Sequence, residues 1–172
     1  MGTTRATWDA DEAVTALYAT EYEALVRLSA LLLRDTGAAE EVVQDAFVAM
    51  HSAWRRLRDK DRALAYLRQS VVNRSRSALR RRTTAERYVR TQGPRLDAAS
   101  AEHEAMATVQ QDSIVEALRG LPARQREALV LRYYGDLSEA EIAEAMGISR
   151  GAVKSHASRG MAALRATLER EP

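Results

Sequence analysis

Apolar residues recur at helical spacing along most of the chain. One series runs from Val14 to Leu32, and another runs from Val43 to Leu57. An apolar residue at every third or fourth position forms one face of a helix. We therefore predict one long helix that ends near Gly37, a second over 39–57 and a third over 62–82. Their inward-facing residues are Val14, Leu17, Tyr18, Tyr22, Leu25, Leu28 and Leu32, then Val43, Ala46, Phe47, Met50, Trp54 and Leu57, then Leu64, Leu67, Val71 and Leu79.

The helical pattern breaks over 91–101, which contains Gly93 and Pro94, and resumes near Ile114. Helices over 114–121 and 125–134 then lead into a further pair. Ser138 and the glutamate three residues later form the sequence signature of a capping box. Gly147 suits a tight turn with positive φ, and Ser149 suits the cap of the next helix. Ile148, Val153, Ala157, Gly160, Leu164 and Leu168 are the expected core positions. This arrangement predicts a helix-turn-helix.

The predicted fold is all-α, with two small helical domains joined by a flexible linker. The domains cover residues 1–90 and 111–172, and the linker covers 91–110. Composition supports helices, since the 172 residues include only eight glycines and three prolines. The sequence contains no cysteine, which excludes disulfides and thiolate metal sites. It also has no run of 18 apolar residues and no signal-peptide layout at its start, so we expect a cytoplasmic protein without membrane insertion.

Charge is strongly segregated beneath a net charge of +2. Residues 1–50 carry three basic and nine acidic side chains, whereas residues 51–90 carry thirteen basic and three acidic ones. Residues 111–172 carry nine of each. A basic run is often only a solvated helix face, but solvation alone does not explain this clustering. An acidic surface beside a basic one indicates two partners of opposite charge.

The second helix of the helix-turn-helix has an outward side of small, hydroxyl-bearing and basic residues. Such side chains can enter a major groove and bond to base edges or phosphates. Basic residues on a helix face commonly serve only solubility. Their combination with two caps and a glycine turn nevertheless predicts DNA binding. The candidate DNA-reading residues are Arg150, Gly151, Lys154, Ser155, Ser158 and Arg159.

The helix over 39–57 has an acidic outer side formed by Glu40, Glu41, Gln44, Asp45 and His51. Paired carboxylates can perform acid–base chemistry, but these side chains are expected to be exposed and form no pocket. Asp45 and His51 are six positions apart, which does not place two metal ligands on one helix face. We therefore predict a docking face for a basic protein surface, with no catalytic residue, metal or cofactor, so that the protein is not an enzyme.

The third helix carries clustered arginines around a single amide, Asn73. Guanidinium groups track a phosphate backbone, and an amide can bond to a base edge. Trp54 and Tyr66 lie at core-like positions, so we expect both to pack inside. The clustered arginines are Arg68, Arg74, Arg76, Arg80, Arg81 and Arg82.

Three strings occur together in order: AEEVVQDAF from Ala39, AYLRQSVVNRSRSALRRR, and LPARQREALVLRYYGDLSEAEIAEAMGISRGAVKSHASRG. From Leu17 to Leu168 the chain resembles an extracytoplasmic-function (ECF) sigma factor of the sigma-70 family. The resemblance implies that the first domain is region 2, which docks on the clamp helices of core RNA polymerase and opens the −10 element. It implies that the second is region 4, which reads the −35 element and meets the polymerase flap. An anti-sigma factor is a further possible partner.

The resemblance also assigns residues. It implies polymerase contacts for Glu41, Gln44, Asp45 and His51. It implies −10 contacts for the 57–61 loop and the third helix, at Leu57, Arg58, Asp61, Asn73, Arg76 and Arg80. It implies −35 contacts for the six residues named on the reading helix. The chain departs from the family in two places, since the loop lacks an aromatic residue and His156 stands where many relatives have arginine.

Two alternatives are a LuxR-like helix-turn-helix regulator and a helical interaction protein that only sequesters partners. The first rests on the string GISRGAVKSH, but no phosphoacceptor or ligand domain is apparent before it. Pull-down of core polymerase separates the three, because only a sigma factor forms a complex that initiates transcription.

Overall fold

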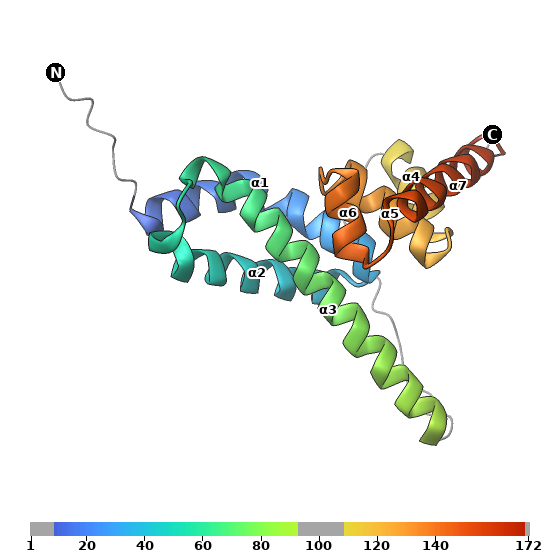
Figure 1. The fold of residues 1–172 in the computed structure, drawn as a ribbon, viewed down its shortest axis with the longest axis horizontal. Helices are drawn as coiled ribbons and strands as arrows, with labels where there is room; N and C mark the ends of the chain where they lie inside the picture. The colour runs from blue at the N-terminus through green and yellow to red at the C-terminus, as the bar shows by residue number, and fades with distance from the viewer. Residues whose placement is uncertain (1–8, 93–108, 171–172) are drawn as a thin grey trace.

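The computed structural model describes residues 9–92 and 109–170, and every regular element in these two ranges is helical, which confirms the all-α prediction (Figure 1). The helices are α1 (Ala10–Leu33), α2 (Thr36–Ala53), α3 (Ala63–Gln92), α4 (Val109–Arg119), α5 (Ala123–Tyr133), α6 (Glu139–Met146) and α7 (Arg150–Leu168). Two short 3-10 turns, η1 (Trp54–Arg56) and η2 (Lys60–Arg62), lie between α2 and α3. Within the described ranges, none of the helices has the length and hydrophobicity needed to cross a bilayer.

Helices α1, α2 and α3 pack around one apolar core. Leu28, Val43, Met50, Leu67 and Val71 have no exposed surface, as the helical pattern predicted. The core includes one polar contact, a buried 2.8 Å hydrogen bond between the hydroxyls of Ser29 on α1 and Ser75 on α3. This hydrogen bond gives both buried hydroxyl groups a partner where the two helices pack together.

The junction between α1 and α2 differs from the prediction. Helix α1 ends at Leu33 rather than near Gly37, because Arg34 adopts a left-handed conformation with φ of 57°. The Asp35 carboxylate accepts a 3.0 Å hydrogen bond from the backbone N–H of Ala38, so α2 begins at Thr36. The left-handed Arg34 ends one helix and the Asp35 cap starts the next, and apolar spacing predicts neither event.

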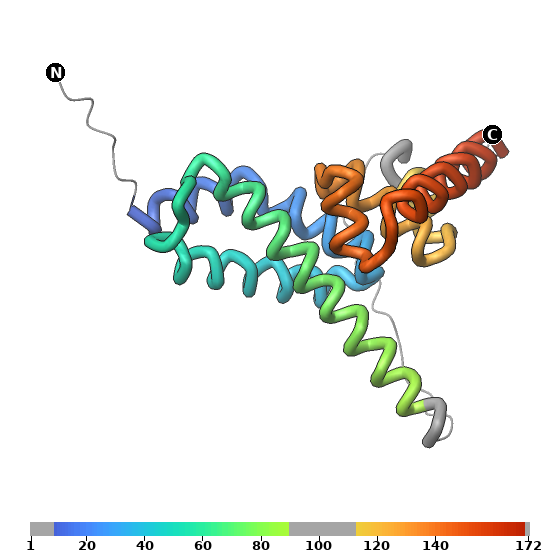
Figure 2. Tube along the Cα trace, in the orientation of Figure 1, coloured from blue at the N-terminus to red at the C-terminus, as the bar shows by residue number. Residues whose placement is uncertain are grey.

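The two ends of the 57–61 segment and the end of α3 also differ from the prediction. Helix α2 stops at Ala53, and the chain then forms η1 and η2, with the Asp59 carboxylate accepting from the Asp61 N–H at 3.1 Å. Helix α3 ends at Gln92 rather than Arg82, and its green second half projects beyond the other helices (Figure 2). Residues 83–92 are mostly polar, so apolar spacing is lost while the helix continues.

Helices α4 to α7 pack on one another, and their buried residues join those of α1 to α3 in one continuous apolar cluster. The predicted helix-turn-helix is confirmed. Both capping-box hydrogen bonds are present, from the Ser138 N–H to the Glu141 carboxylate at 2.7 Å and from the Glu141 N–H to the Ser138 hydroxyl at 3.2 Å. Gly147 ends α6 with φ of 65°, and Ser149 caps α7 through the Ala152 N–H at 3.1 Å. A Cβ at Gly160 would lie 3.0 Å from a Leu129 methyl group, so glycine permits the close packing of α7 on α5.

The two halves contact each other through α1 and α3. Helix α1 packs against α4 and α5, and Arg76 of α3 forms an ion pair with Glu127 of α5. Arg68 lies 3.6 Å from Asp136, in the segment before α6. The predicted linker, 91–110, lies mainly outside the described residues, and its described ends belong to α3 and α4.

Candidate nucleic-acid and protein interfaces

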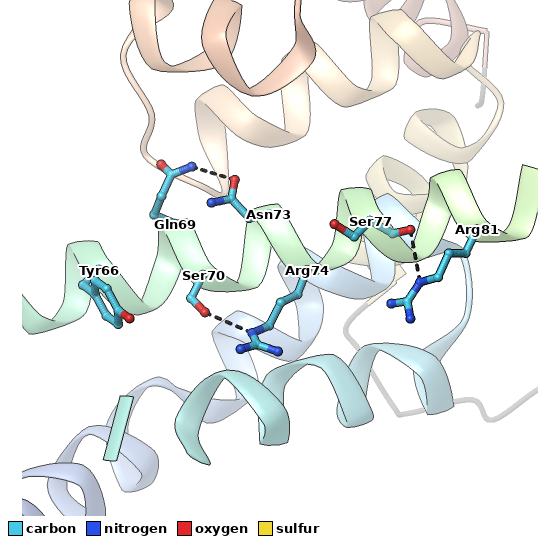
Figure 3. A pocket seen from close by; sticks show the side chains of 7 residues that line it. All are labelled: Tyr66, Gln69, Ser70, Asn73, Arg74, Ser77 and Arg81. Atoms are coloured by element: carbon cyan, nitrogen blue, oxygen red, sulfur yellow. Dashed lines mark hydrogen bonds between the residues drawn. The ribbon is translucent and has the colours of Figure 1, made fainter. Parts of the chain in front are cut away.

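An open groove of about 420 Å³ runs along one face of α3 (Figure 3). Its lining residues are Tyr66, Gln69, Ser70, Asn73, Arg74, Ser77 and Arg81. The Gln69 amide donates to the Asn73 carbonyl oxygen at 3.1 Å along one edge, and the Arg74 guanidinium donates to the Ser70 hydroxyl at 3.2 Å along the other. The groove therefore presents an aromatic ring, an amide pair and two guanidinium groups on one helix face.

The structure places Tyr66 in this groove, so the expectation that it packs in the core is wrong. Its exposed fraction is 41%, whereas Trp54 is buried at 5% as expected. Tyr66 directly precedes buried Leu67, and it lies in register with Ser70, Ser77 and Arg81 on a polar stripe of α3. That stripe was visible in the sequence as polar residues spaced by three or four positions. Tyr18, also predicted to be inward, is 43% exposed and stacks on Tyr22 at the edge of the core.

The predicted −10 residues do not all gather at the groove. Asn73 lines it, but none of residues 57–61 does. Leu57 is half-buried between η1 and η2, and Arg58 is exposed in the same stretch. Asp61 is exposed within η2. Lys60 lies over the Trp54 ring at 5.4 Å from its centroid, which anchors this segment to the core.

The arginines of α3 divide into two groups. Arg80 and Arg81 are exposed, and both line a second shallow hollow near the end of the helix. Arg76 instead faces the second half of the molecule, where its side chain and that of Glu127 retain only 17% and 13% of their exposure. Arg82 donates to the Leu33 carbonyl oxygen at 2.7 Å and pairs with Asp35 at 3.1 Å, so it holds the end of α1. Thus Arg76 and Arg82, two of the arginines predicted to bind phosphates, are engaged by other residues of this chain.

The predicted docking face lies on the exposed side of α2. Glu41, Gln44 and Asp45 all face solvent. His51 is exposed as well, but its Nε2 lies 2.6 Å from the Asp11 carboxylate of α1. Apolar periodicity did not identify Val48, which is 66% exposed among these polar residues. Val48 therefore adds one exposed apolar side chain to the polar residues of the predicted docking face.

The predicted reading surface of α7 is exposed throughout, at Arg150, Gly151, Lys154, Ser155, Ser158 and Arg159. The Glu139 carboxylate of α6 lies 3.5 Å from the Arg150 Nε and 3.9 Å from the Lys154 Nζ. Nearby, the hydrogen bonds from Ser138 lower the pKa of Glu141, which keeps the capping carboxylate ionised.

Buried Arg126 is a structural side chain that the sequence did not reveal. It donates to the carbonyl oxygens of Leu121 and Arg119 at 3.4 and 3.5 Å, and so ties the end of α4 to α5. Burial lowers the pKa of its guanidinium, with repulsion from Arg34 as the second cause. Among the residues that the structure describes, no three potential metal ligands cluster.

Comparison with known proteins agrees with this geometry. Residues 17–85 match the family described as Sigma-70 region 2, and residues 111–164 match Sigma-70, region 4. The RNA polymerase sigma-E factor of Streptomyces avermitilis is 33% identical over 87% of this chain and 82% of its own length. The ECF RNA polymerase sigma factor SigK of Mycobacterium ulcerans is 30% identical over 83% of this chain and 78% of its own length.

Two solved structures share the fold. The sigma factor RpoE of Bartonella quintana, in complex with the anti-sigma factor NepR, has a TM-score of 0.67 at 22% identity and covers 92% of this chain and 98% of its own. CnrH, in complex with the cytosolic domain of CnrY, has a TM-score of 0.57 at 24% identity and covers 95% of this chain and 96% of its own. The match to region 2 also favours a sigma factor over the two alternatives. The chain therefore belongs to the ECF group of the sigma-70 family, whose members are not enzymes but factors for promoter-specific transcription initiation by RNA polymerase.

Proposed function

We propose that this protein docks on core RNA polymerase through α2, captures an unpaired −10 base in the groove of α3 and reads the −35 element with α7. The observation that carries the proposal is the groove, because it places an aromatic ring beside an amide and two cations on one exposed face. The functional units are residues 1–90 and 111–172, with 91–110 between them. As for the family, the site of action is the cytoplasm.

The groove has the chemistry to bind single-stranded DNA. The exposed Tyr66 ring offers a stacking surface, and base–aromatic stacking contributes about 1–3 kcal/mol per base. The Asn73 amide can bond to a base edge, while Arg74 and Arg81 lie where they can contact phosphates. Stacking offsets the unstacking free energy of a few kcal/mol, roughly, that a captured base requires. Arg80 extends the same basic surface, whereas Arg76 is paired with Glu127.

In the second half, α7 supports major-groove binding. Its exposed residues combine three cations with hydroxyl groups and a glycine that permits close approach. Arg150, Lys154 and Arg159 supply donors for guanine edges or phosphates, and Ser155 and Ser158 add adaptable hydroxyls. The exposed faces of α2 and of the second half are the surfaces proposed for the polymerase clamp helices and flap. The solved structure of RpoE contains the anti-sigma factor NepR, and we propose a partner of that class here too.

Loss of polymerase binding tests the docking face. We expect Gln44→Ala with Asp45→Arg to abolish core binding, because the charge reversal opposes a basic partner surface. Val48→Glu should weaken binding about tenfold or more, since it places a charge at the centre of the contact. The measurement is the dissociation constant for core polymerase, with Glu23→Arg on the exposed side of α1 as the matched charge reversal. Equal binding by the double variant and Glu23→Arg would remove this face from the proposal.

Promoters randomised at each −10 position test the groove against the 57–61 segment. We expect Tyr66→Ala to reduce run-off transcription at every −10 sequence, because stacking does not distinguish bases strongly. Asn73→Ala should relax the preference at one position, since an amide reads a base edge. Exchanging residues 57–61 for another sequence should shift −10 preference and leave −35 preference intact. If only the exchange changes −10 preference, the groove is not the capture site; if only Asn73→Ala does, the segment is a connector.

A further inference from the structure

Glu139 occupies the first turn of α6, and its carboxylate lies close to two basic residues of α7. One oxygen of its carboxylate lies 3.5 Å from the Arg150 Nε and 3.9 Å from the Lys154 Nζ. Arg150 and Lys154 are four residues apart, so they share one face of α7. A single carboxylate on the neighbouring helix therefore bridges both cations.

The burial of the three side chains is unequal. The Glu139 side chain is 24% exposed, whereas those of Arg150 and Lys154 are 68% and 72% exposed. The carboxylate thus lies at the base of the two cations, and the cations remain accessible. Exposed ion pairs stabilise a protein little, so stability does not account for this arrangement. Its main effect is on where the two cations point and on the charge that they present.

We propose that Glu139 is a positioning residue that increases the sequence specificity of −35 recognition. It draws Arg150 and Lys154 toward α6, and it neutralises part of their charge. Non-specific binding comes from cations that contact phosphates of any sequence. The Glu139 carboxylate competes with DNA phosphates for the two cations, which lowers the affinity for DNA of any sequence. At the correct −35 element, hydrogen bonds from the cations to base edges restore that affinity. Specificity is a difference of affinities, and this residue lowers the affinity for the wrong partner.

The other acidic residues of α6 do not duplicate this role. Glu141 is engaged by the cap at Ser138, and Glu144 is exposed with no ion pair to the described residues of α7. Glu139 also lies in the first turn, where any acidic residue interacts favourably with the helix dipole. That general contribution would affect the stability of α6 and leave base discrimination unchanged. The two roles therefore predict different measurements.

The inference rests on the proposed function, and the experiment first establishes that function in the parent protein. A −35 sequence is selected with reconstituted holoenzyme from a library, and transcription is then compared between this promoter and one with a scrambled −35 element. If the parent does not distinguish the two promoters, −35 reading by this protein fails and the role of Glu139 fails with it. If the parent does distinguish the two promoters, the Glu139 variants then test the role of Glu139 separately.

We expect Glu139→Gln to raise binding and transcription at the scrambled promoter and to reduce the discrimination ratio about tenfold. The slope of log affinity against log salt should steepen by about one, because about one more phosphate contact forms. Glu144→Gln removes the same charge from the same helix and should leave both quantities unchanged. Glu139→Gln in a Lys154→Gln background should change the salt slope less than it does alone, since one of its partners is missing.

Three outcomes would overturn the proposal. Equal effects of Glu139→Gln and Glu144→Gln would show that only net charge matters. Unchanged discrimination together with a lower melting temperature would reduce Glu139 to a helix-stabilising residue. Weaker binding to both promoters with the same ratio would show that the carboxylate orients the cations for affinity and not for specificity.

Discussion

Helices α3 and α7 both carry basic residues proposed for DNA, yet they use them differently. On α3, Arg76 pairs with Glu127 of α5, and Arg82 pairs with Asp35, which precedes α2. Arg68 lies near Asp136. On α7, the basic side chains stay mostly exposed, and Glu139 is the one carboxylate of the described residues within 4 Å of them. The comparison shows that basic sequence alone does not separate an arginine that holds helices together from one that contacts DNA.

The largest expected effect on stability is the loss of the Arg76–Glu127 pair. Arg76→Ala leaves the largely buried Glu127 with Arg124, 3.9 Å away, as its remaining cationic partner. We therefore expect the free energy of unfolding to fall by about 2 kcal/mol, below the value for a fully buried pair that loses its one partner. Since the pair joins the two halves, the molecule should also expand. Denaturant unfolding and small-angle scattering measure the two effects. Arg80→Ala is the matched control on the exposed side of α3, and an equal effect of both variants would contradict the distinction.

A smaller effect on stability is expected for Glu141→Gln, which removes the carboxylate from the capping box of α6. Because hydrogen bonds from Ser138 lower the pKa of Glu141, its contribution is present above the ordinary value of 4.5 and is lost as pH falls through the lower pKa of the folded state. Glu141→Gln should therefore cost a few tenths of a kcal/mol at neutral pH. Thermal melting between pH 3 and 7, roughly, measures it. The variant should also lose part of the acid dependence, and an unchanged acid profile would exclude this carboxylate as its source.

The smallest effect on stability is expected for Arg159→Ala on α7. The side chain is exposed, so unfolding should change by less than about 0.5 kcal/mol. DNA binding by the holoenzyme should nevertheless fall. Loss of a base contact costs about 1–3 kcal/mol at one base pair, whereas loss of a phosphate contact weakens all sequences and flattens the salt dependence. An unchanged −35 footprint and salt slope would place Arg159 outside the interface.

Much of the fold was predictable because its signals are local. Apolar spacing identified the core residues Leu28, Val43 and Val71, and the serine caps identified the starts of α6 and α7. The end of α1 was misplaced because it depends on a left-handed Arg34 and an aspartate cap. The end of α3 was misplaced because a polar helix gives no apolar pattern.

The candidate sites were predictable to the level of the helix and not of the side chain. Sequence placed Asn73 and Lys154 on the two helices that we propose to bind DNA, but it assigned Tyr66 to the core. The exposure of Tyr66 depends on which neighbours cover that side of α3, and helical spacing does not specify them. Val48 and Glu139 were missed for the same reason, since the proposed role of each depends on which side chains surround it in the folded protein.

The sequence by itself determined the all-α class, the helix-turn-helix and the segregation of acidic from basic segments, because each follows from residues within a few turns of one another. Only the tertiary structure decided which charges remain available. Arg76 and Glu127 are 51 positions apart, and their pairing requires the two halves to meet. Charge is a property of composition, but its availability to a partner depends on distances between helices that are remote in the chain.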